Sequence, residues 1–295
     1  MFDFLLHIIS IAGIYALIAV GLNIQSGYAG LLNFGHIAFA GIGAYAVGIG
    51  AHLGCSPLLS IPAGIIIAMM VGLLMAALGG KLAADYWGIA TLAIAEIIRT
   101  LAFNEDWLTG GPQGISGIVM PFEAGGQRAN NLLFAAVIMA LLALAAFVSQ
   151  RMAGQRFGRA LRLMREQPQL AVCFGYSLPA LKRTALMVSA ALTAFAGSLL
   201  AYYTGYVSPD YLLSSESFII WSMVMIGGLG NVYGVVAGAL LVQCLYSFIP
   251  FAKDFIDINT DIAGALRLGA LGALLLACLL GRPGGIFPER LRKIP

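Results

Sequence analysis

Charged residues are scarce in this 295-residue chain. Only 10% of its residues carry a charge, against about a quarter in an ordinary soluble domain. Its four cysteines and three histidines are scattered along the sequence, and no two cysteines have the CxxC spacing. This dispersal argues against both a disulfide framework and a zinc site. We therefore expect no metal site.

Motifs for nucleotide and hydrolytic chemistry are missing as well. Gly80-Lys81 lacks both the earlier glycine and the following Ser or Thr of a phosphate-binding loop. The run GGLGNVYG has Tyr233 where a dinucleotide fingerprint requires its third glycine. The run GISG resembles the motif of intramembrane serine proteases, but those place the histidine on a later helix, and all three histidines here precede Ser116. We expect no bound cofactor and no enzymatic activity.

Long apolar runs replace the missing charges. Sixty per cent of the residues are hydrophobic, and apolar runs long enough to span a bilayer recur along the chain. A soluble fold would need polar helix faces, whereas these segments are apolar all round. The sequence predicts an all-α, polytopic membrane bundle of eight to ten transmembrane helices, forming a single domain over residues 1–295. We place nine spans at 4–24, 34–52, 58–80, 86–105, 129–150, 184–205, 215–230, 232–250 and 262–281.

Some of these spans have unusual features. The seventh and eighth are short and are separated by GGLGN, so they could equally form a broken or re-entrant pair. Transporters often contain inverted repeats, and segments 15–35 and 184–205 share a loose pattern of small residues and AG pairs. The second span is crowded with small residues four positions apart, which predicts close approach of neighbouring helix backbones.

The distribution of charge orients the spans. Three segments hold 12 of the 16 basic residues, whereas the loops between them hold two basic residues and eight acids. The basic segments are 81–85, 151–183 and 282–295; the acidic loops are 104–128, 206–216 and 251–261. The positive-inside rule places the central loop and the C-terminal tail in the cytoplasm. With nine spans, the N-terminus lies outside.

Two groups of polar residues fall in or beside predicted spans. Asn33 and His36 follow the segment SGYAG, and a polar break at membrane depth is tolerated only where protein or water satisfies the backbone. They either line a translocation pathway or satisfy one another within the bundle. Glu96 and Arg99 share one helix face. They form either an internally neutralised pair holding two helices together, which we favour, or a contact with the transported solute.

The segment RFGRALRLMREQ (156–167) predicts a basic amphipathic helix in the central cytoplasmic loop. Phe157, Leu161 and Met164 form an apolar stripe opposite the arginines, and Pro168 cannot continue the helix without losing a hydrogen bond. The helix could lie on anionic lipid, or it could dock its stripe into a groove of a partner protein. The residue pattern leaves both alternatives open.

Four segments, taken in order, resemble the permease subunits of branched-chain amino acid ABC importers over nearly the whole chain. They are YWGIATLAIAEIIRTL (86–101), LTGGPQGISGI (108–118), RFGRALRLMRE (156–166), and YVSPDY with SMVMIGGLGNVYGVVAGALL (206–241). The LTGG loop and the TLAIAEIIR helix resemble the M-type permease of the high-affinity leucine, isoleucine and valine uptake family rather than its H-type partner.

The resemblance implies a bacterial inner-membrane permease that works with a second permease subunit, two ABC ATPases and an extracytoplasmic amino-acid-binding protein. ATP would be bound and hydrolysed by the partner ATPases, and no nucleic acid is involved. In this family the central cytoplasmic segment couples to an ATPase, which would assign that role to Arg156, Phe157, Gly158, Arg159, Leu161, Glu166 and Gly175. The family also includes urea and short-amide transporters, so it constrains the substrate loosely. The alternative is a stand-alone secondary transporter or channel, with Glu96 and Arg99 as its candidate ion-coupling pair.

Overall fold

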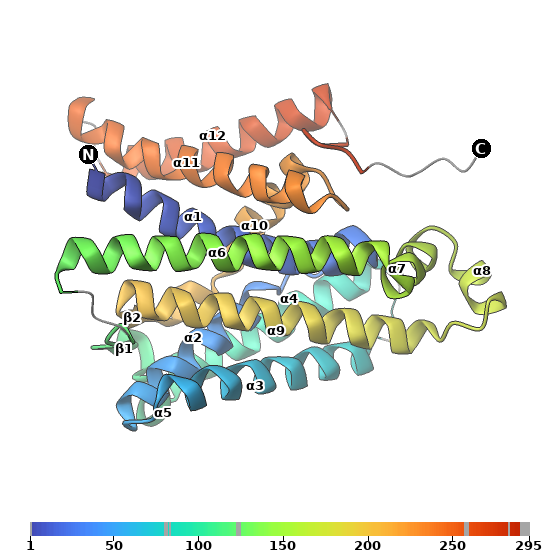
Figure 1. Ribbon diagram of the computed structural model, residues 1–295, viewed down its shortest axis with the longest axis horizontal. Coiled ribbons are helices and arrows are strands. Elements are labelled where there is room, and N and C mark those ends of the chain that lie inside the picture. The colour runs from blue at the N-terminus through green and yellow to red at the C-terminus, as the bar shows by residue number, and fades with distance from the viewer. Residues whose placement is uncertain are drawn as a thin grey trace.

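The computed structural model describes residues 2–79, 82, 84–121, 125–256, 260–282 and 284–289, which form an all-α bundle (Figure 1). Its helices are α1 (Phe2–Asn23), α2 (Ile37–His52), α3 (Pro57–Leu78), α4 (Ala84–Asn104), α5 (Asp106–Thr109), α6 (Gln127–Gly154), α7 (Arg156–Glu166), α8 (Pro168–Cys173), α9 (Leu178–Thr204), α10 (Ser214–Gly227), α11 (Val232–Ile256) and α12 (Thr260–Gly281). A π-helical turn, η1 (Ile24–Tyr28), extends α1, and η3 (Gly111–Gln113) and η4 (Pro209–Leu212) are 3-10 turns. Lys81 and residues 283 and 290–295 of the predicted tail lie outside the described residues.

Each of the nine predicted spans coincides with a helix, but nine membrane crossings are not confirmed. Six helices of the described chain are long and apolar enough to cross a membrane. α2 has 16 residues and α10 has 14, so they are about 24 and 21 Å long, shorter than a hydrocarbon core of about 30 Å. The seventh predicted span, α10, is therefore short, whereas the eighth, α11, is a 25-residue helix.

The two short helices occupy equivalent places in two units that run in opposite directions. α1 is followed by the irregular residues 29–36 and then α2, and α9 is followed by residues 205–213 and then α10. α1 runs from the N-terminal end of the bundle towards α7, whereas α9 runs from α8 back to that end (Figure 1). α2 and α10 begin together inside the bundle, where the Ile37 N–H donates to the Ser217 hydroxyl (3.2 Å). This is the geometry of an inverted repeat. The loosely matching segments 15–35 and 184–205 overlap α1 and α9, which are the first helices of the two units.

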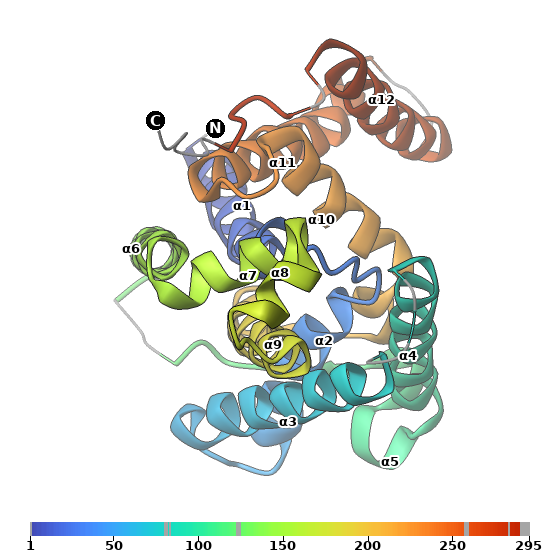
Figure 2. The same cartoon turned by 90° about the vertical axis from the view of Figure 1, so that its right-hand side faces the viewer.

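Small residues let α2 and α9 pack backbone against backbone. A Cβ atom at Gly43 would overlap the carbonyl of Ala194, and one at Gly197 would overlap the carbonyl of Ala40. The predicted close approach is therefore confirmed. Viewed along the bundle, α3, α4, α6 and α12 surround α1, α2, α9 and α10 (Figure 2).

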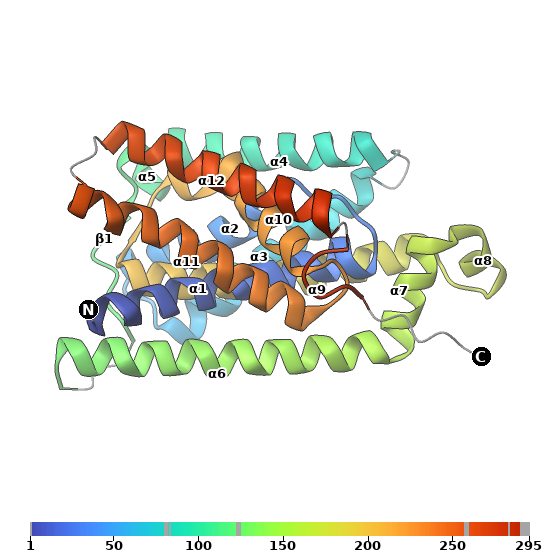
Figure 3. The ribbon, with the colours of Figure 1, turned by 90° about the horizontal axis from the view of Figure 1, so that it is seen from above.

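The two ends of the bundle differ in structure. At one end, β1 (Ile115–Ser116) pairs antiparallel with β2 (Tyr206–Val207) and joins two of the predicted external loops. The N-terminus lies at this same end (Figure 3). α7, α8 and the described C-terminal residues lie at the opposite end, so the predicted basic loop and tail share one side of the molecule.

Candidate functional site

A buried network of polar side chains surrounds residues 29–36. The Asn33 amide donates to the Gln25 side-chain oxygen (2.9 Å), and the Gln25 amide donates to the Ser189 hydroxyl (2.6 Å). The Ser189 hydroxyl donates in turn to the Gly21 carbonyl (2.7 Å). All three side chains are fully buried. Because buried polar groups are costly unless paired, this chain of bonds holds the break between α1 and α2 in one conformation.

His36 lies beside this network at the start of α2. Its Nε2 contacts the Thr193 hydroxyl (2.9 Å) and the Ile18 carbonyl (3.2 Å), and the imidazole is fully buried. The indole N–H of Trp221 on α10 donates to the Asn33 carbonyl (2.8 Å). Both Asn33 and His36 are thus enclosed by protein at the junction of the two units in this conformation.

The backbone of residues 29–36 finds partners without forming a helix. The Phe34 N–H donates to the Thr91 hydroxyl on α4 (3.2 Å), and the Gly35 N–H donates to the Asn33 side chain (2.9 Å). A Cβ atom at Gly35 would overlap the Thr91 carbonyl, so glycine is required for this close approach. Irregular backbone within a membrane bundle is stable only when its polar groups are satisfied in this way.

Glu96 and Arg99 lie apart from this network on α4. The Arg99 Nε donates to a Glu96 carboxylate oxygen (2.9 Å), so the pair closes within a single helix. The Glu96 side chain is 46% exposed and that of Arg99 is 24% exposed, whereas Asn33 and His36 are enclosed. The structure therefore pairs Glu96 with Arg99 but does not bring this pair to the buried network.

The apolar stripe of α7 is covered by its own chain. Leu161 is fully buried, Met164 is nearly so, and Phe157 is partly buried against the same apolar cluster. The helix packs on α6, α9 and η1. Both sequence-based alternatives placed this stripe outside the protein, on lipid or in a partner's groove, whereas it lies on the bundle. The exposed side chains of α7 are those of Arg156, Arg159 and Glu166.

The two glycines of the predicted coupling segment have structural roles. Gly158 is buried where α7 folds back on α6, and a Cβ atom there would collide with the backbone of Met152 and Ala153. Gly175 follows α8 and has a φ of 82°, a left-handed conformation that favours glycine. Gly158 thus sets the position of α7, and Gly175 turns the chain towards α9.

Arg162 and Arg165 link α7 to a carboxylate that was not among the predicted site residues. Arg162 Nε lies 2.7 Å from one oxygen of Glu289, and Arg165 Nη2 lies 2.8 Å from the other. Arg165 also donates to the Gly27 carbonyl in η1, and the Arg162 guanidinium lies over the Tyr28 ring at 5.2 Å. Burial disfavours the charge of Arg165, but its hydrogen bonds to carboxylates outweigh this and raise its pKa.

The C-terminal residues 284–289 bring Glu289 into place by binding the turn between α10 and α11. The Ile286 N–H donates to the Ile226 carbonyl (2.8 Å) near the end of α10. In the turn itself, the Gly230 N–H donates to the Asn23 side chain at the end of α1 (2.9 Å). A continuous set of contacts therefore joins α7, the C-terminal residues, the GGLGN turn and α1.

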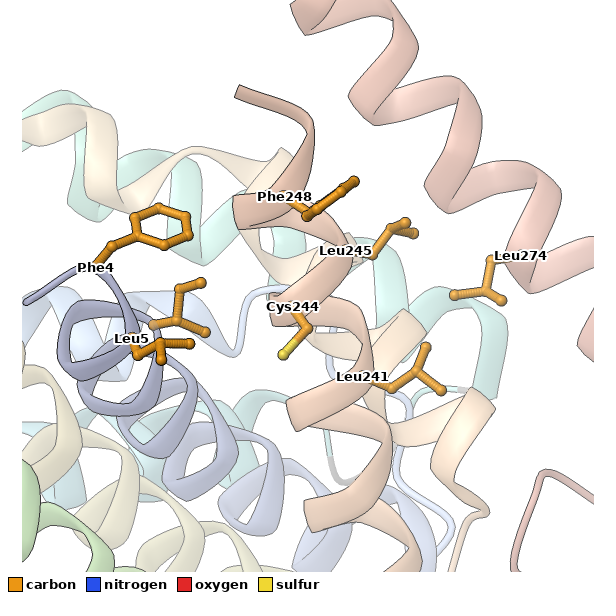
Figure 4. Close-up of a pocket in the computed structure, with 8 residues that line it drawn as sticks. Phe4, Leu5, Leu241, Cys244, Leu245, Phe248 and Leu274 are labelled. Atoms are coloured by element: carbon orange, nitrogen blue, oxygen red, sulfur yellow. The ribbon is translucent and has the colours of Figure 1, made fainter. Parts of the chain in front are cut away.

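An apolar groove of about 560 Å³ lies towards the N-terminal end, between α1, α11 and α12 (Figure 4). It is lined by Phe4, Leu5, Ile8, Leu241, Cys244, Leu245, Phe248 and Leu274. The lining offers no charged group to orient a polar solute, and its apolar surface is typical of contact with lipid or with another helix.

Residues 4–279 match the family model described as branched-chain amino acid transport system / permease component. The chain belongs to this family. The permease is 30% identical to LivM, a permease protein of the high-affinity branched-chain amino acid transport system of Escherichia coli K12, over 93% of this chain and 68% of that protein. A probable LivM of Methanocaldococcus jannaschii is 27% identical over 94% of this chain and 91% of its own length. LivH of Salmonella typhimurium LT2 is 23% identical over 95% of this chain and 92% of its own length.

These relatives confirm the predicted M-type permease of an ABC importer and a transport function rather than an enzymatic one. LivM and LivH of Escherichia coli K12 both match the permease, which indicates that such a system has a second, related permease. No solved structure matches the chain.

Proposed function

We propose that the permease translocates branched-chain or related hydrophobic amino acids, paired with a second permease subunit. Two partner ATPases bind and hydrolyse the ATP, and an extracytoplasmic binding protein delivers the substrate. The names of the relatives support the substrate class. The proposal rests on how α7 is placed. Its apolar side packs on the bundle, while Arg156, Arg159 and Glu166 remain exposed at one end of the molecule.

The proposed orientation in a bacterial cytoplasmic membrane places α7, α8 and the C-terminus inside the cell and the N-terminus outside. The concentration of basic residues in segment 151–183 supports it. The loops joined by β1 and β2 then face outwards, where the binding protein docks.

In the proposed mechanism, nucleotide-driven closure of the ATPases displaces α7. Leu161 and Arg165 transmit this displacement to η1, and η1 leads directly into residues 29–36. Asn33 and His36 stand at the closed point of the pathway and exchange their partners when it opens. Such a displacement drives transport only if the two pathway states differ in their contacts with α7. Glu96 and Arg99 form a neutralised pair on α4.

The coupling role of α7 can be tested by reversing its exposed charges. We expect Arg156→Glu combined with Arg159→Glu to abolish co-purification of the ATPase and amino acid uptake, because the variant reverses the charge of the exposed face that we propose docks on the ATPase. The permease itself should reach the membrane in normal amounts. Arg151→Glu is the matched control, since Arg151 is an exposed arginine near the end of α6, outside α7. Wild-type uptake by the double variant at normal expression would contradict the proposal.

A further inference from the structure

A second cavity, of about 520 Å³, lies near the apolar groove and is lined by polar as well as apolar side chains. The residues that line it belong to α1, α9, η4, α11 and α12, and they lie in the part of each element that is at the N-terminal end of the bundle. Its volume falls within the range of about 300–1,000 Å³ that is usual for small-molecule sites. Phe4 lines both this cavity and the groove, so the two spaces adjoin.

An arginine enters this cavity from the first half of a hydrophobic helix. Arg267 of α12 lines the wall, and its guanidinium carbon lies 2.9 Å from the centre of the Tyr246 ring. Its Nε has no hydrogen-bond partner among the described residues. The side chain of Asp261, a neighbouring acid in the sequence, lies outside the described residues. Ionisable side chains within a membrane bundle usually mark a pathway or a ligand site.

Acceptor groups line the same cavity. Gln243 is 5% exposed, and its side-chain oxygen has no partner among the described residues. The Tyr15 hydroxyl donates to Glu216 at the start of α10 (2.8 Å), which leaves its oxygen lone pairs available to a donor. The charges of Glu216 and Arg267 lie within electrostatic reach of each other, and no direct ion pair joins them in the described structure.

A site with an arginine and nearby acceptors complements a zwitterion. We propose that this cavity binds an amino acid with an aliphatic side chain, holding the α-carboxylate on Arg267 and the α-ammonium at Gln243 and Tyr15. This inference rests on the proposed function and assigns a substrate site to it. A carboxylate is a matched acceptor for the guanidinium donors, and Ile11 and Leu200 supply an apolar wall for the side chain.

The site ends at a constriction. Tyr15, Leu200 and Tyr211 also line a gap of only about 10 Å³ that reaches Ile37 at the start of α2. Such a gap holds at most about one water molecule. The substrate therefore waits on the external side of the junction between α2 and α10.

The site can be tested without relying on transport. In the assembled importer, the four native cysteines are replaced by alanine and Ser247, which lines the cavity, is changed to cysteine (Ser247→Cys). Alkylation of this thiol by a membrane-impermeant maleimide is then followed in the presence of leucine. We expect leucine to slow alkylation, whereas isoamylamine, which is leucine without the carboxylate, and 4-methylpentanoate, which is leucine without the ammonium, should not.

A second test removes the positive charge of Arg267. Arg267→Gln should abolish protection by leucine and lower leucine uptake about tenfold, because a charge-assisted hydrogen bond is lost. Arg128→Gln is the control, since Arg128 is an exposed arginine near the same end, paired with Asp3 at 3.4 Å. The inference is overturned if leucine leaves alkylation unchanged while the Ser247→Cys importer takes up leucine, or if Arg267→Gln transports normally. A wild-type importer unable to take up leucine would refute the proposed function, and this inference with it.

Discussion

Replacing Glu289 by glutamine should loosen the attachment of α7 to the C-terminal residues. The carboxylate lies 2.7 Å from Arg162 and 2.8 Å from Arg165, and its side chain is 13% exposed. Glutamine preserves the shape of the side chain but removes the negative charge between two guanidinium groups. The loss of a hydrogen bond to a charged group costs about 1.5–3 kcal/mol. Because both arginines are partly exposed, we expect a loss of about 2 kcal/mol, or about 30-fold in local opening.

Hydrogen exchange of the permease without its ATPases measures this opening directly, because Glu166 is then exposed as in the structure. We expect the amides of residues 160–166 to exchange about 30-fold faster in Glu289→Gln, while those in the middle of α9 are unchanged. Glu166→Gln is the matched control, because Glu166 also bonds Arg165 (3.0 Å) but is 49% exposed. An exposed pair contributes less than about 1 kcal/mol, so its effect should stay below about fivefold. Equal exchange in the two variants would refute the assigned role of Glu289.

Two further predictions concern the helices of the bundle. Glu96→Gln alone should reduce the amount of permease in the membrane, because it leaves Arg99 unpaired within a span; the cost is less than the about 2.5–3.5 kcal/mol of an arginine at the span centre, since Arg99 lies five residues from the end of α4. The neutral double variant Glu96→Gln/Arg99→Gln should restore both amount and uptake. A double variant present in normal amounts but inactive would instead indicate solute contact. Gly197→Ala should destabilise the permease by about 1–3 kcal/mol, since its Cβ atom would overlap the Ala40 carbonyl. Gly264→Ala, whose Cβ atom meets no other atom within 4 Å, should leave the yield of folded protein unchanged, and equal yields of the two variants would contradict the packing argument.

The helices could be located from the sequence because each apolar run carries its own signal. The contacts that organise the site could not, because they join residues far apart in the chain. Gln25 and Ser189 are separated by 164 positions, and Arg165 and Glu289 by 124. One clue was available: Glu289 is the only acid among residues 282–295, beside four basic residues. Nothing in one sequence distinguishes an apolar stripe that packs on its own bundle from one that packs on a partner, which is why the environment of α7 was wrongly anticipated.

In the proposed mechanism, the inverted units let one short helix act on both α1–α2 and α9–α10. Arg165 contacts Gly27, at the end of the first unit that lies next to α7, while Glu289 belongs to residues that bind the end of α10 in the second. In the proposed mechanism, a displacement of α7 would therefore reach both units at the same end of the bundle. α2 and α10 begin together at the junction, so relative motion of the units must change the contacts there. Rocking of one repeat against the other is the usual route to alternating access. Loss of Glu289 would disconnect the second unit while Gly27 still holds the first, so ATP hydrolysis should continue without a matching rate of uptake.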